Sequence, residues 1–245
     1  MNVKIYILAG GDQEEWCEDF GVGYKALLPW SGTTIIQHMV NNIKKDLDVP
    51  ITVIGRTEWP IDTVEGATLL KIDSSSIMDT ISVIQPDTDY VLLLTGDSPL
   101  VRGKDLIPFI ETPSELVAGV IYKEDFEKMF PGWHKTFIPL KDGKIKLAGA
   151  ALISKDKWQT VIDEGTKYYN YRKNPFMIVW KMGISLFAKL ITGQLSINDV
   201  IKWVDKKFGV KATAVTVSPV MGADVDKKSD YLMLKLFETL GREKQ

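Results

Sequence analysis

The chain has 245 residues, and 30 basic against 32 acidic side chains leave a net charge of -2. Hydrophobic residues at 45% and charged residues at 25% are typical of a globular protein and exclude a disordered, collagen-like or coiled-coil chain. The charge balance argues against nucleic-acid binding through overall charge, but it is compatible with a local site for a phosphorylated small molecule. The length favours one large α/β domain over residues 1–245.

The single cysteine, Cys17, has no partner for an internal disulfide. The chain also begins without the basic, apolar and small-residue pattern of a secretory signal. Both features favour the cytoplasm as the location of the protein. Cys17 lies among acidic residues, which predicts a raised thiol pKa and disfavours a nucleophilic role.

The first half of the chain alternates strand and helix patterns. Residues 3–8 form an apolar, β-branched run that stops at Gly10-Gly11, as a buried strand does. A loop to residue 28 follows, and residues 34–45 then carry a helical stripe of apolar side chains. The same reasoning predicts further strands at 51–54, 68–72, 90–95 and 115–122, and further helices at 76–84 and 103–110. Apolar strands that alternate with amphipathic helices predict a doubly wound, Rossmann-like α/β fold with a mainly parallel sheet.

The second half of the chain departs from simple alternation. Residues 136–154 contain two extended stretches joined by the turn Asp142-Gly143, which predicts a hairpin and therefore a mixed sheet. Residues 155–209 are mainly helical. We interpret them as an insertion, because a strand pattern resumes at 212–217. A final helix is predicted at 228–240.

The most apolar segment is residues 176–192, FMIVWKMGISLFAKLIT. As one helix it would carry a narrow polar stripe of Lys181, Ser185 and Lys189. Its length and two lysines argue against a membrane span. A buried helix, or a helix that packs against a second subunit in a homodimer, is the main interpretation. Contact with a membrane surface or an apolar substrate groove is the alternative.

Two predicted strands end in residues that packing does not require. The first strand ends in Ala9-Gly10-Gly11 and the fourth in Gly96-Asp97. In an open doubly wound sheet, ligands bind outside the carboxyl ends of the strands, where the strand order reverses. If these strands are neighbours, their ends face one pocket. Paired glycines let phosphate oxygens approach backbone N–H groups, and a carboxylate can hold a divalent cation.

Two other phosphate-binding motifs are excluded. Gly10-Gly11 does not open a GxGxxG sequence, which disfavours a Rossmann dinucleotide site. Residues 98–105 are not a Walker A loop, because a serine replaces its first glycine and an aspartate follows its lysine. The loop after the first strand instead delivers a single lysine, Lys25, before the turn at Pro29.

Four short segments resemble one superfamily, in the same order along the chain. They are LAGG at 8–11, KALLPW at 25–30, TGDSPL at 95–100 and GADVDKKSDY at 222–231. Together they are similar to the NTP-transferase superfamily, in particular its molybdenum-cofactor-guanylyltransferase-like branch. The resemblance implies Mg²⁺-dependent transfer of a nucleoside monophosphate from an NTP to a phosphorylated small molecule, with release of pyrophosphate.

The resemblance also implies a role for each matching residue. Lys25 would neutralise charge on the phosphates, and Asp97 would ligate Mg²⁺ and take part in catalysis. A second acidic ligand would be Asp224 or Asp226, with Asp224 slightly favoured. The remaining residues would contact the nucleotide: Leu8, Ala9, Gly10, Gly11, Ser75, Ser76 and Gly96. Of these, the two serines would contact the nucleobase.

One segment departs from the family pattern. Relatives carry an arginine in the glycine loop, whereas residues 12–24 contain five acidic side chains and no basic one. Carboxylates beside a triphosphate repel it unless they face solvent or hold metal. A nucleotide-binding protein with weak catalysis therefore stays open as an alternative. The pair Asp224-Val225-Asp226 leaves open a second one, a GT-A-like glycosyltransferase that uses a nucleotide sugar.

Overall fold

The computed structural model has an α/β fold with an eight-stranded sheet in the order β10-β7-β9-β6-β1-β4-β5, with β8 paired to β9. The pairs β1–β4, β4–β5 and β7–β10 are parallel. The pairs β7–β9 and β8–β9 are antiparallel. The predicted mixed, mainly parallel sheet is therefore confirmed. The structure describes residues 1–73, 76–169, 171 and 175–242.

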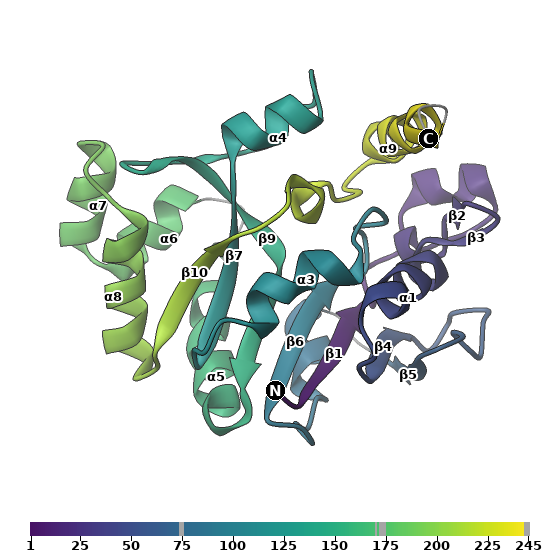
Figure 1. Ribbon diagram of the computed structural model, residues 1–245, viewed down its shortest axis with the longest axis horizontal. Helices are drawn as coiled ribbons and strands as arrows, with labels where there is room; N and C mark the ends of the chain where they lie inside the picture. Colours follow the sequence, from purple (N-terminus) through teal and green to yellow (C-terminus); the bar gives the residue numbers. More distant parts are fainter. Residues whose placement is uncertain (74–75, 170, 172–174, 243–245) are drawn as a thin grey trace. The chain divides into compact units, whose positions relative to one another are not determined.

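The strands that the sequence predicted appear in the predicted order, and the structure adds two short strands near residue 30 and a helix over Lys123–Met129 that were not predicted (Figure 1). The strands are β1 (Val3–Leu8), β2 (Pro29–Trp30), β3 (Thr33–Thr34), β4 (Ile51–Arg56), β5 (Thr68–Ile72), β6 (Tyr90–Thr95), β7 (Leu116–Tyr122), β8 (Ile138–Leu140), β9 (Gly143–Ser154) and β10 (Ala212–Thr216). The helices are α1 (Ile35–Asp46), α2 (Ile77–Ser82), α3 (Gly103–Ile110), α4 (Lys123–Met129), α5 (Trp158–Tyr169), α6 (Pro175–Met182), α7 (Ile184–Ile191), α8 (Ile197–Phe208) and α9 (Lys228–Arg242). Short 3₁₀ helices are η1 (Glu15–Phe20), η2 (Lys25–Leu27), η3 (Lys155–Lys157) and η4 (Pro219–Gly222).

The chain divides into two compact units, each assembled from separate segments. Unit 1 consists of Met1–Val3, Gln85–Leu92 and Ile107–Gly222. Unit 2 consists of Lys4–Ile84, Leu93–Leu106 and Ala223–Gln245. The helical segment at 155–209 lies wholly within unit 1. The description of residues 1–245 as one domain stays a prediction.

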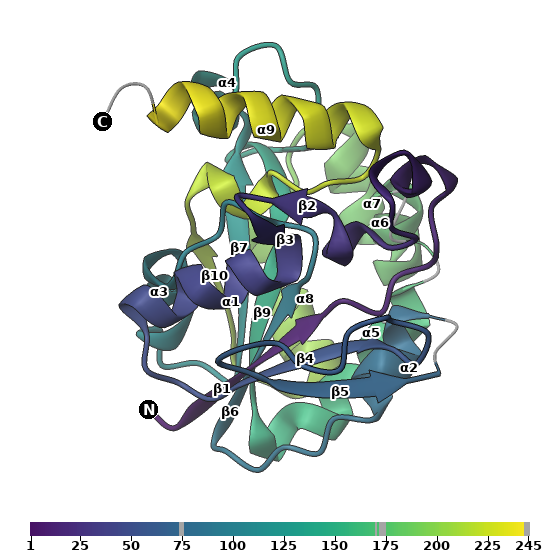
Figure 2. The ribbon, with the colours of Figure 1, turned by 90° about the vertical axis from the view of Figure 1, so that its right-hand side faces the viewer.

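In unit 2, β1, β4 and β5 lie side by side (Figure 2). The register pairs Ile5 with Ile51 and Leu8 with Ile54. The following helix α1 begins where the Thr34 hydroxyl accepts a hydrogen bond from the backbone N–H of Gln37 at 3.2 Å. Its apolar stripe is completely buried, which explains why the periodic pattern predicted this helix correctly.

The strand order reverses at β1. From β1 the chain proceeds outward to β4 and β5, and it then returns to β6 on the other side of β1. The backbone N–H of Gly96, just after β6, donates a 2.9 Å hydrogen bond to the carbonyl of Leu8 at the end of β1. The carboxyl ends of these two strands are therefore neighbours, which is the condition that the sequence analysis set for a shared pocket.

In unit 1, the prediction of a single helix over residues 176–192 is wrong. Gly183 separates α6 from α7 and adopts φ 133° and ψ 152°, a backbone conformation that only glycine adopts readily. The Trp180 and Phe187 rings meet edge to face at 5.0 Å between centroids, so the two helices pack against each other. Lys181 and Lys189 consequently do not share one polar stripe. None of the helices in the described part of the chain has the length and apolar character that crossing a bilayer requires.

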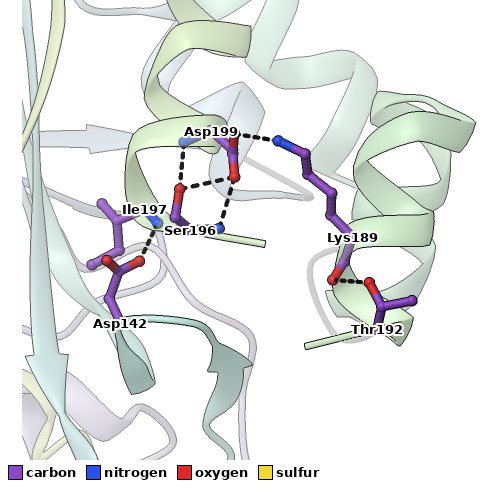
Figure 3. Close-up of polar contacts among 6 residues, drawn as sticks. All are labelled: Asp142, Lys189, Thr192, Ser196, Ile197 and Asp199. Atoms are coloured by element: carbon purple, nitrogen blue, oxygen red, sulfur yellow. Dashed lines mark hydrogen bonds and ion pairs between the residues drawn. The ribbon is translucent and has the colours of Figure 1, made fainter. Parts of the chain in front are cut away.

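Helix α8 begins at a network of polar contacts (Figure 3). The Ser196 hydroxyl accepts a hydrogen bond from the backbone N–H of Asp199, whose carboxylate accepts one from the N–H of Ser196, forming a capping box. Lys189 of α7 donates to Asp199 at 2.6 Å, and the N–H of Ile197 donates to Asp142 at 2.7 Å. The hydrogen bond from Lys189, followed by those from Ser196, holds the pKa of Asp199 well below its usual range. These contacts tie α8 to α7 and to the β8–β9 turn.

Candidate functional site

A pocket of about 140 Å³ lies at the carboxyl ends of β1 and β6, within unit 2. Seven of the residues predicted from the sequence line it: Leu8, Ala9, Gly10, Gly11, Lys25, Gly96 and Asp97. The pocket therefore lies at the reversal of strand order, where an open α/β sheet binds its ligands.

Close packing requires glycine at the end of β6, beside the end of β1. A Cβ on Gly96 would lie 2.7 Å from the Cβ of Ala9 and 3.0 Å from its Cα, so a larger residue would push the two strand ends apart. A Cβ on Gly11 would meet nothing within 4 Å. The backbone at Gly11 is thus open, and a ligand can approach it closely.

The C-terminal acidic turn lies beside the end of β6. The backbone N–H of Val225 donates to the carbonyl of Asp97 at 2.9 Å, which holds the flanking Asp224 and Asp226 near this strand end. Burial raises the pKa of Asp97, and the negative charge of Asp224 raises it further. A hydrogen bond with Thr95 and the charge of Lys25 oppose this rise, and Asp226 adds a smaller upward effect. Of the two candidates for a second acidic ligand, Asp224 therefore interacts more strongly with Asp97.

These aspartates fit part of a metal site. Across the residues that the structure describes, no group of three or more His, Cys, Asp or Glu side chains could by itself hold a metal ion. Magnesium, however, is often bound by one or two carboxylates, with water and substrate phosphates as its other ligands. Asp97 and Asp224 are neighbouring carboxylates whose mutual repulsion a cation would relieve. The pair suits a cation that arrives with a phosphorylated substrate.

Lys25 reaches the pocket from η2. Its Nζ lies 3.5 Å from Glu14 Oε1, and its side chain is 22% exposed, so the amine is accessible to a ligand. A second acid of the same loop, Asp19, forms a 2.6 Å ion pair with Lys228 of α9. Two of the five acidic side chains that the sequence places in this loop are therefore paired with lysines, which reduces the repulsion expected for a bound triphosphate.

Arg56 is a candidate that the sequence analysis missed. It ends β4, and its Cδ lies 3.8 Å from the position that a Cβ on Gly10 would occupy. Its Nε and Nη1 atoms are buried and have no close hydrogen-bond partner among the described residues, although Nε lies 3.5 Å from the carboxylate of Glu58 and forms an ion pair with it. A buried guanidinium with unsatisfied N–H groups beside a glycine loop suits a nearby anion. The signal in the sequence was a basic residue at the end of the strand after β1.

The sequence analysis predicted that Ser75 and Ser76 contact the nucleobase of the ligand. Ser75 lies outside the described residues. Ser76 is the N-cap of α2, where its hydroxyl accepts a hydrogen bond from the N–H of Asp79 at 3.2 Å. Ser76 does not line the pocket, whereas Ile77 and Thr80 of the same helix do. Helix α2 therefore borders the pocket through residues that the sequence analysis did not select.

Cys17 behaves as predicted for a structural residue. It is completely buried, and burial, followed by the charge of Glu14, raises its pKa to about 11. A thiol of this kind is almost entirely protonated near neutral pH and is a poor nucleophile.

Comparison with known proteins supports the fold. No protein-family model and no curated protein matches the sequence. A hypothetical transferase from Thermus thermophilus has 24% identity and a TM-score of 0.77, and the match covers 94% of this chain and 99% of that one. The 2-C-methyl-D-erythritol 4-phosphate cytidylyltransferase of Thermus thermophilus has 13% identity and a TM-score of 0.56, over 99% of this chain and 100% of that one.

A third similar structure is Rv0371c from Mycobacterium tuberculosis in complex with manganese, with 16% identity and a TM-score of 0.50, over 96% of this chain and 99% of that one. In all three comparisons the similarity extends over nearly the whole of both chains. The chain therefore has the complete α/β fold of these proteins. Its place in the molybdenum-cofactor-guanylyltransferase-like branch stays a prediction.

Proposed function

We propose that the protein is a nucleotidyltransferase that depends on Mg²⁺. It would transfer a nucleoside monophosphate from an NTP to a phosphorylated small molecule and release pyrophosphate. The observation that carries this proposal is that the Gly10-Gly11 backbone, Lys25 and Asp97 line one pocket in unit 2, while the turn that contains Asp224 is hydrogen-bonded to the backbone of Asp97. The cytoplasm is the location that we propose for it.

The reaction forms one bond and breaks one. A phosphate oxygen of the acceptor bonds to the α-phosphorus of the NTP, and the bond between that phosphorus and the oxygen bridging to the β-phosphate breaks. Anions must be brought together and pyrophosphate must leave, so positioning and positive charge can supply most of the catalysis without a covalent nucleophile.

Each of the groups that line the pocket or lie beside it would have a role in this reaction. The open backbone at Gly10-Gly11 would hold phosphate oxygens, and the Lys25 amine would neutralise their charge. Arg56 would supply the second positive charge that the loop at 12–24 lacks. Asp97 and Asp224 would hold the magnesium ion, with Asp226 as the weaker alternative to Asp224. The bound ion would neutralise charge on the phosphates and on the departing pyrophosphate.

Two of the similar structures agree with this chemistry. One is described as a cytidylyltransferase for a phosphorylated erythritol, and another is a complex with manganese. The two rival functions have less support. For a GT-A-like glycosyltransferase, the acid-x-acid pair would be expected near the middle strand rather than in a C-terminal turn. For a nucleotide-binding protein with weak catalysis, the argument was the arginine missing from the loop at 12–24. Arg56 is a positive charge near Gly10 that could replace it, and two of the acids in the loop are paired with lysines.

The test is pyrophosphate release from each of the four NTPs with MgCl₂ and a panel of sugar phosphates and alcohol phosphates. We expect release with at least one combination, and none in EDTA. Lys25→Ala should lower the rate by about 10² to 10³, the usual effect of removing one electrostatic partner. Lys104→Ala is the matched control, because Lys104 is an exposed lysine of the same unit outside the pocket.

Other results would contradict the proposal. Stabilisation by nucleotides without turnover on any acceptor would favour the binding protein. Hydrolysis or transfer from a nucleotide sugar, without pyrophosphate release from NTPs, would favour the glycosyltransferase. An unchanged rate in Lys25→Ala would remove this residue from the site.

A further inference from the structure

Unit 1 contains a second pocket, which has no part in the proposed reaction. Its volume is about 190 Å³. One wall is the face of the sheet formed by β7, β8, β9 and β10, and the other is formed by α6, α8 and the residues just before α8. Figure 1 shows α8 running beside β10. All the residues that line this pocket belong to unit 1.

Small side chains on the sheet create the pocket. Ala118 of β7 is paired in register with Ala214 of β10, and Leu116 with Ala212, so three alanines lie together on this face. The strand β7 lies between β9 and β10, yet Leu116 and Ala118 are only partly buried. Protein interiors are close-packed, and a central strand with accessible alanines indicates that the covering helices do not fill the space above it.

The pocket offers almost nothing to a polar ligand. Among the residues that the structure describes, no charged side chain lines this pocket, and the lining is aliphatic apart from Met182 and Thr213. The Thr213 hydroxyl already shares a 2.9 Å hydrogen bond with Ser114. A polar molecule would lose its hydrogen bonds to water here without replacement, whereas an apolar group would not.

The wall of the pocket is fixed in position. Leu195 and Val179 in its lining belong to a buried cluster with Leu190 of α7. The start of α8 is held by the contacts of Asp199 with Lys189 and of Ile197 with Asp142 (Figure 3). These contacts oppose a movement of the start of α8 into the space of the pocket.

We propose that unit 1 binds an aliphatic hydrocarbon group of a small-molecule ligand in this pocket. An apolar cavity of about 150 Å³ stays dry and binds benzene, so this one suits an aliphatic group of about six to eight carbon atoms. The outer face of α6 carries Phe176, Met177 and Trp180, all exposed, so apolar surface continues from the pocket wall to the outside of the same helix. This site is independent of the proposed nucleotidyltransferase activity, and either can be correct without the other.

The test uses octan-1-ol as the probe and the methyl NMR signals of Ile, Leu and Val in the full-length protein. We expect saturable shifts at Ile178, Ile197 and Ile201, which line the pocket, and none at Ile35 and Ile36 in unit 2. Octane-1,8-diol has the same chain with a hydroxyl at each end and should bind at least about tenfold more weakly, because its second hydroxyl would leave water for a lining that is almost entirely aliphatic.

Two variants locate the site. Ala118→Leu fills the pocket and should weaken octan-1-ol binding at least about tenfold, because the added atoms occupy the space of the ligand. Ile184→Ser is the matched control, because Ile184 is 75% exposed on α7 and lies outside the pocket. It should bind octan-1-ol as the wild type does.

Each contrary result overturns the proposal. These are the absence of saturable shifts in the wild type, equal binding by folded Ala118→Leu and wild type, and loss of binding in Ile184→Ser alone. If circular dichroism shows that Ala118→Leu does not fold, the wild-type shifts decide. Shifts confined to residues outside the pocket would then refute the proposal, and shifts confined to its lining would support it.

Discussion

Asp97 and Asp224 are the two carboxylates on which the proposed site depends most. Burial of Asp97 and the charge of Asp224 both disfavour the ionised form of Asp97. Without a cation, the folded protein therefore carries an unfavourable electrostatic interaction at the place where it would hold one. Functional sites commonly reduce stability in this way.

Asp97→Asn should separate stability from activity. The amide keeps the shape of the side chain and removes the repulsion with Asp224, so the melting temperature in EDTA should rise. A gain of about 1 kcal/mol corresponds to roughly 2–4 °C in a chain of this size. Pyrophosphate release should fall by about 10² to 10³. Asp226→Asn is the control and should change both quantities less, since Asp226 has the weaker effect on Asp97. A variant that is neither more stable nor less active would contradict the assignment of Asp97.

Arg56 is expected to act on substrate binding. Arg56→Met keeps much of the side-chain volume and removes the charge, so the KM for the NTP should rise roughly tenfold, the effect of losing about 1.4 kcal/mol of charge-assisted binding. The kcat should change less. Arg56→Lys should recover part of the affinity, because it restores the charge without the planar guanidinium.

A purely structural Arg56 would give a different result. Arg56→Met would then lower the melting temperature and leave the KM unchanged. Glu58→Gln is the control for the neighbouring ion pair, because Glu58 lies 3.5 Å from Arg56 Nε and is about half exposed. This substitution should leave the KM close to the wild-type value.

The sequence analysis identified the candidate site residues that directly follow β1 and β6. It also identified Lys25 in the loop after β1. Strand ends are visible in the sequence because an apolar run stops at glycine and aspartate. Arg56 was missed because it does not belong to any of the four matching segments and approaches Gly10 only through the pairing of β4 with β1. The Thr80 contact with the pocket likewise depends on where α2 packs, which no local pattern specifies.

Among the secondary-structure elements, β1 and β6 end so close together that one added methyl group between them should lower the stability of the fold. In Gly96→Ala, the new Cβ would lie 2.7 Å from that of Ala9, so the strand ends must separate. We expect a loss of about 1–3 kcal/mol, as for other overpacked cores. Gly11→Ala is the matched control, because its Cβ would meet nothing within 4 Å.

Urea denaturation measures the two changes. Gly11→Ala should keep the stability of the wild type while weakening nucleotide binding, since a Cβ would narrow the approach to the backbone. Equal stability of the two alanine variants would show that the close approach of Gly96 to Ala9 does not hold the strand ends together.

The helices of unit 1 show where local patterns stop being informative. Residues 176–192 have enough apolar side chains for one continuous helix, and a glycine within a helix costs only about 1 kcal/mol relative to alanine. The pattern therefore cannot distinguish a glycine inside a helix from one between two helices. The packing of Trp180 against Phe187 accompanies the break at Gly183, and this contact depends on tertiary structure.

For the whole molecule, the alternation of strands and helices was sufficient to predict the fold class, and the Asp142-Gly143 turn was sufficient to predict a mixed sheet. The division into two units and the apolar pocket of unit 1 were not predicted. Both depend on pairings between distant segments, such as Ala118 with Ala214, that leave no periodic signal in the sequence. A single alanine in a strand does not indicate a pocket. Only the strand register shows that alanines of neighbouring strands lie side by side and leave space above the sheet.

Because the two pockets belong to different units, their ligands should protect different parts of the chain from hydrogen exchange. A nucleotide with Mg²⁺ at 100 times its dissociation constant stabilises the folded state by about 2.7 kcal/mol. Where an amide exchanges only through an opening that releases the ligand, its exchange should therefore slow by up to about 100-fold. This protection should appear in peptides of residues 8–12, 24–30, 93–97 and 223–226, all within unit 2. Octan-1-ol should instead protect residues 116–120, 197–204 and 212–214 of unit 1. Nucleotide protection confined to unit 1 would contradict the assignment of the nucleotide pocket, and octan-1-ol protection confined to unit 2 would contradict that of the apolar one.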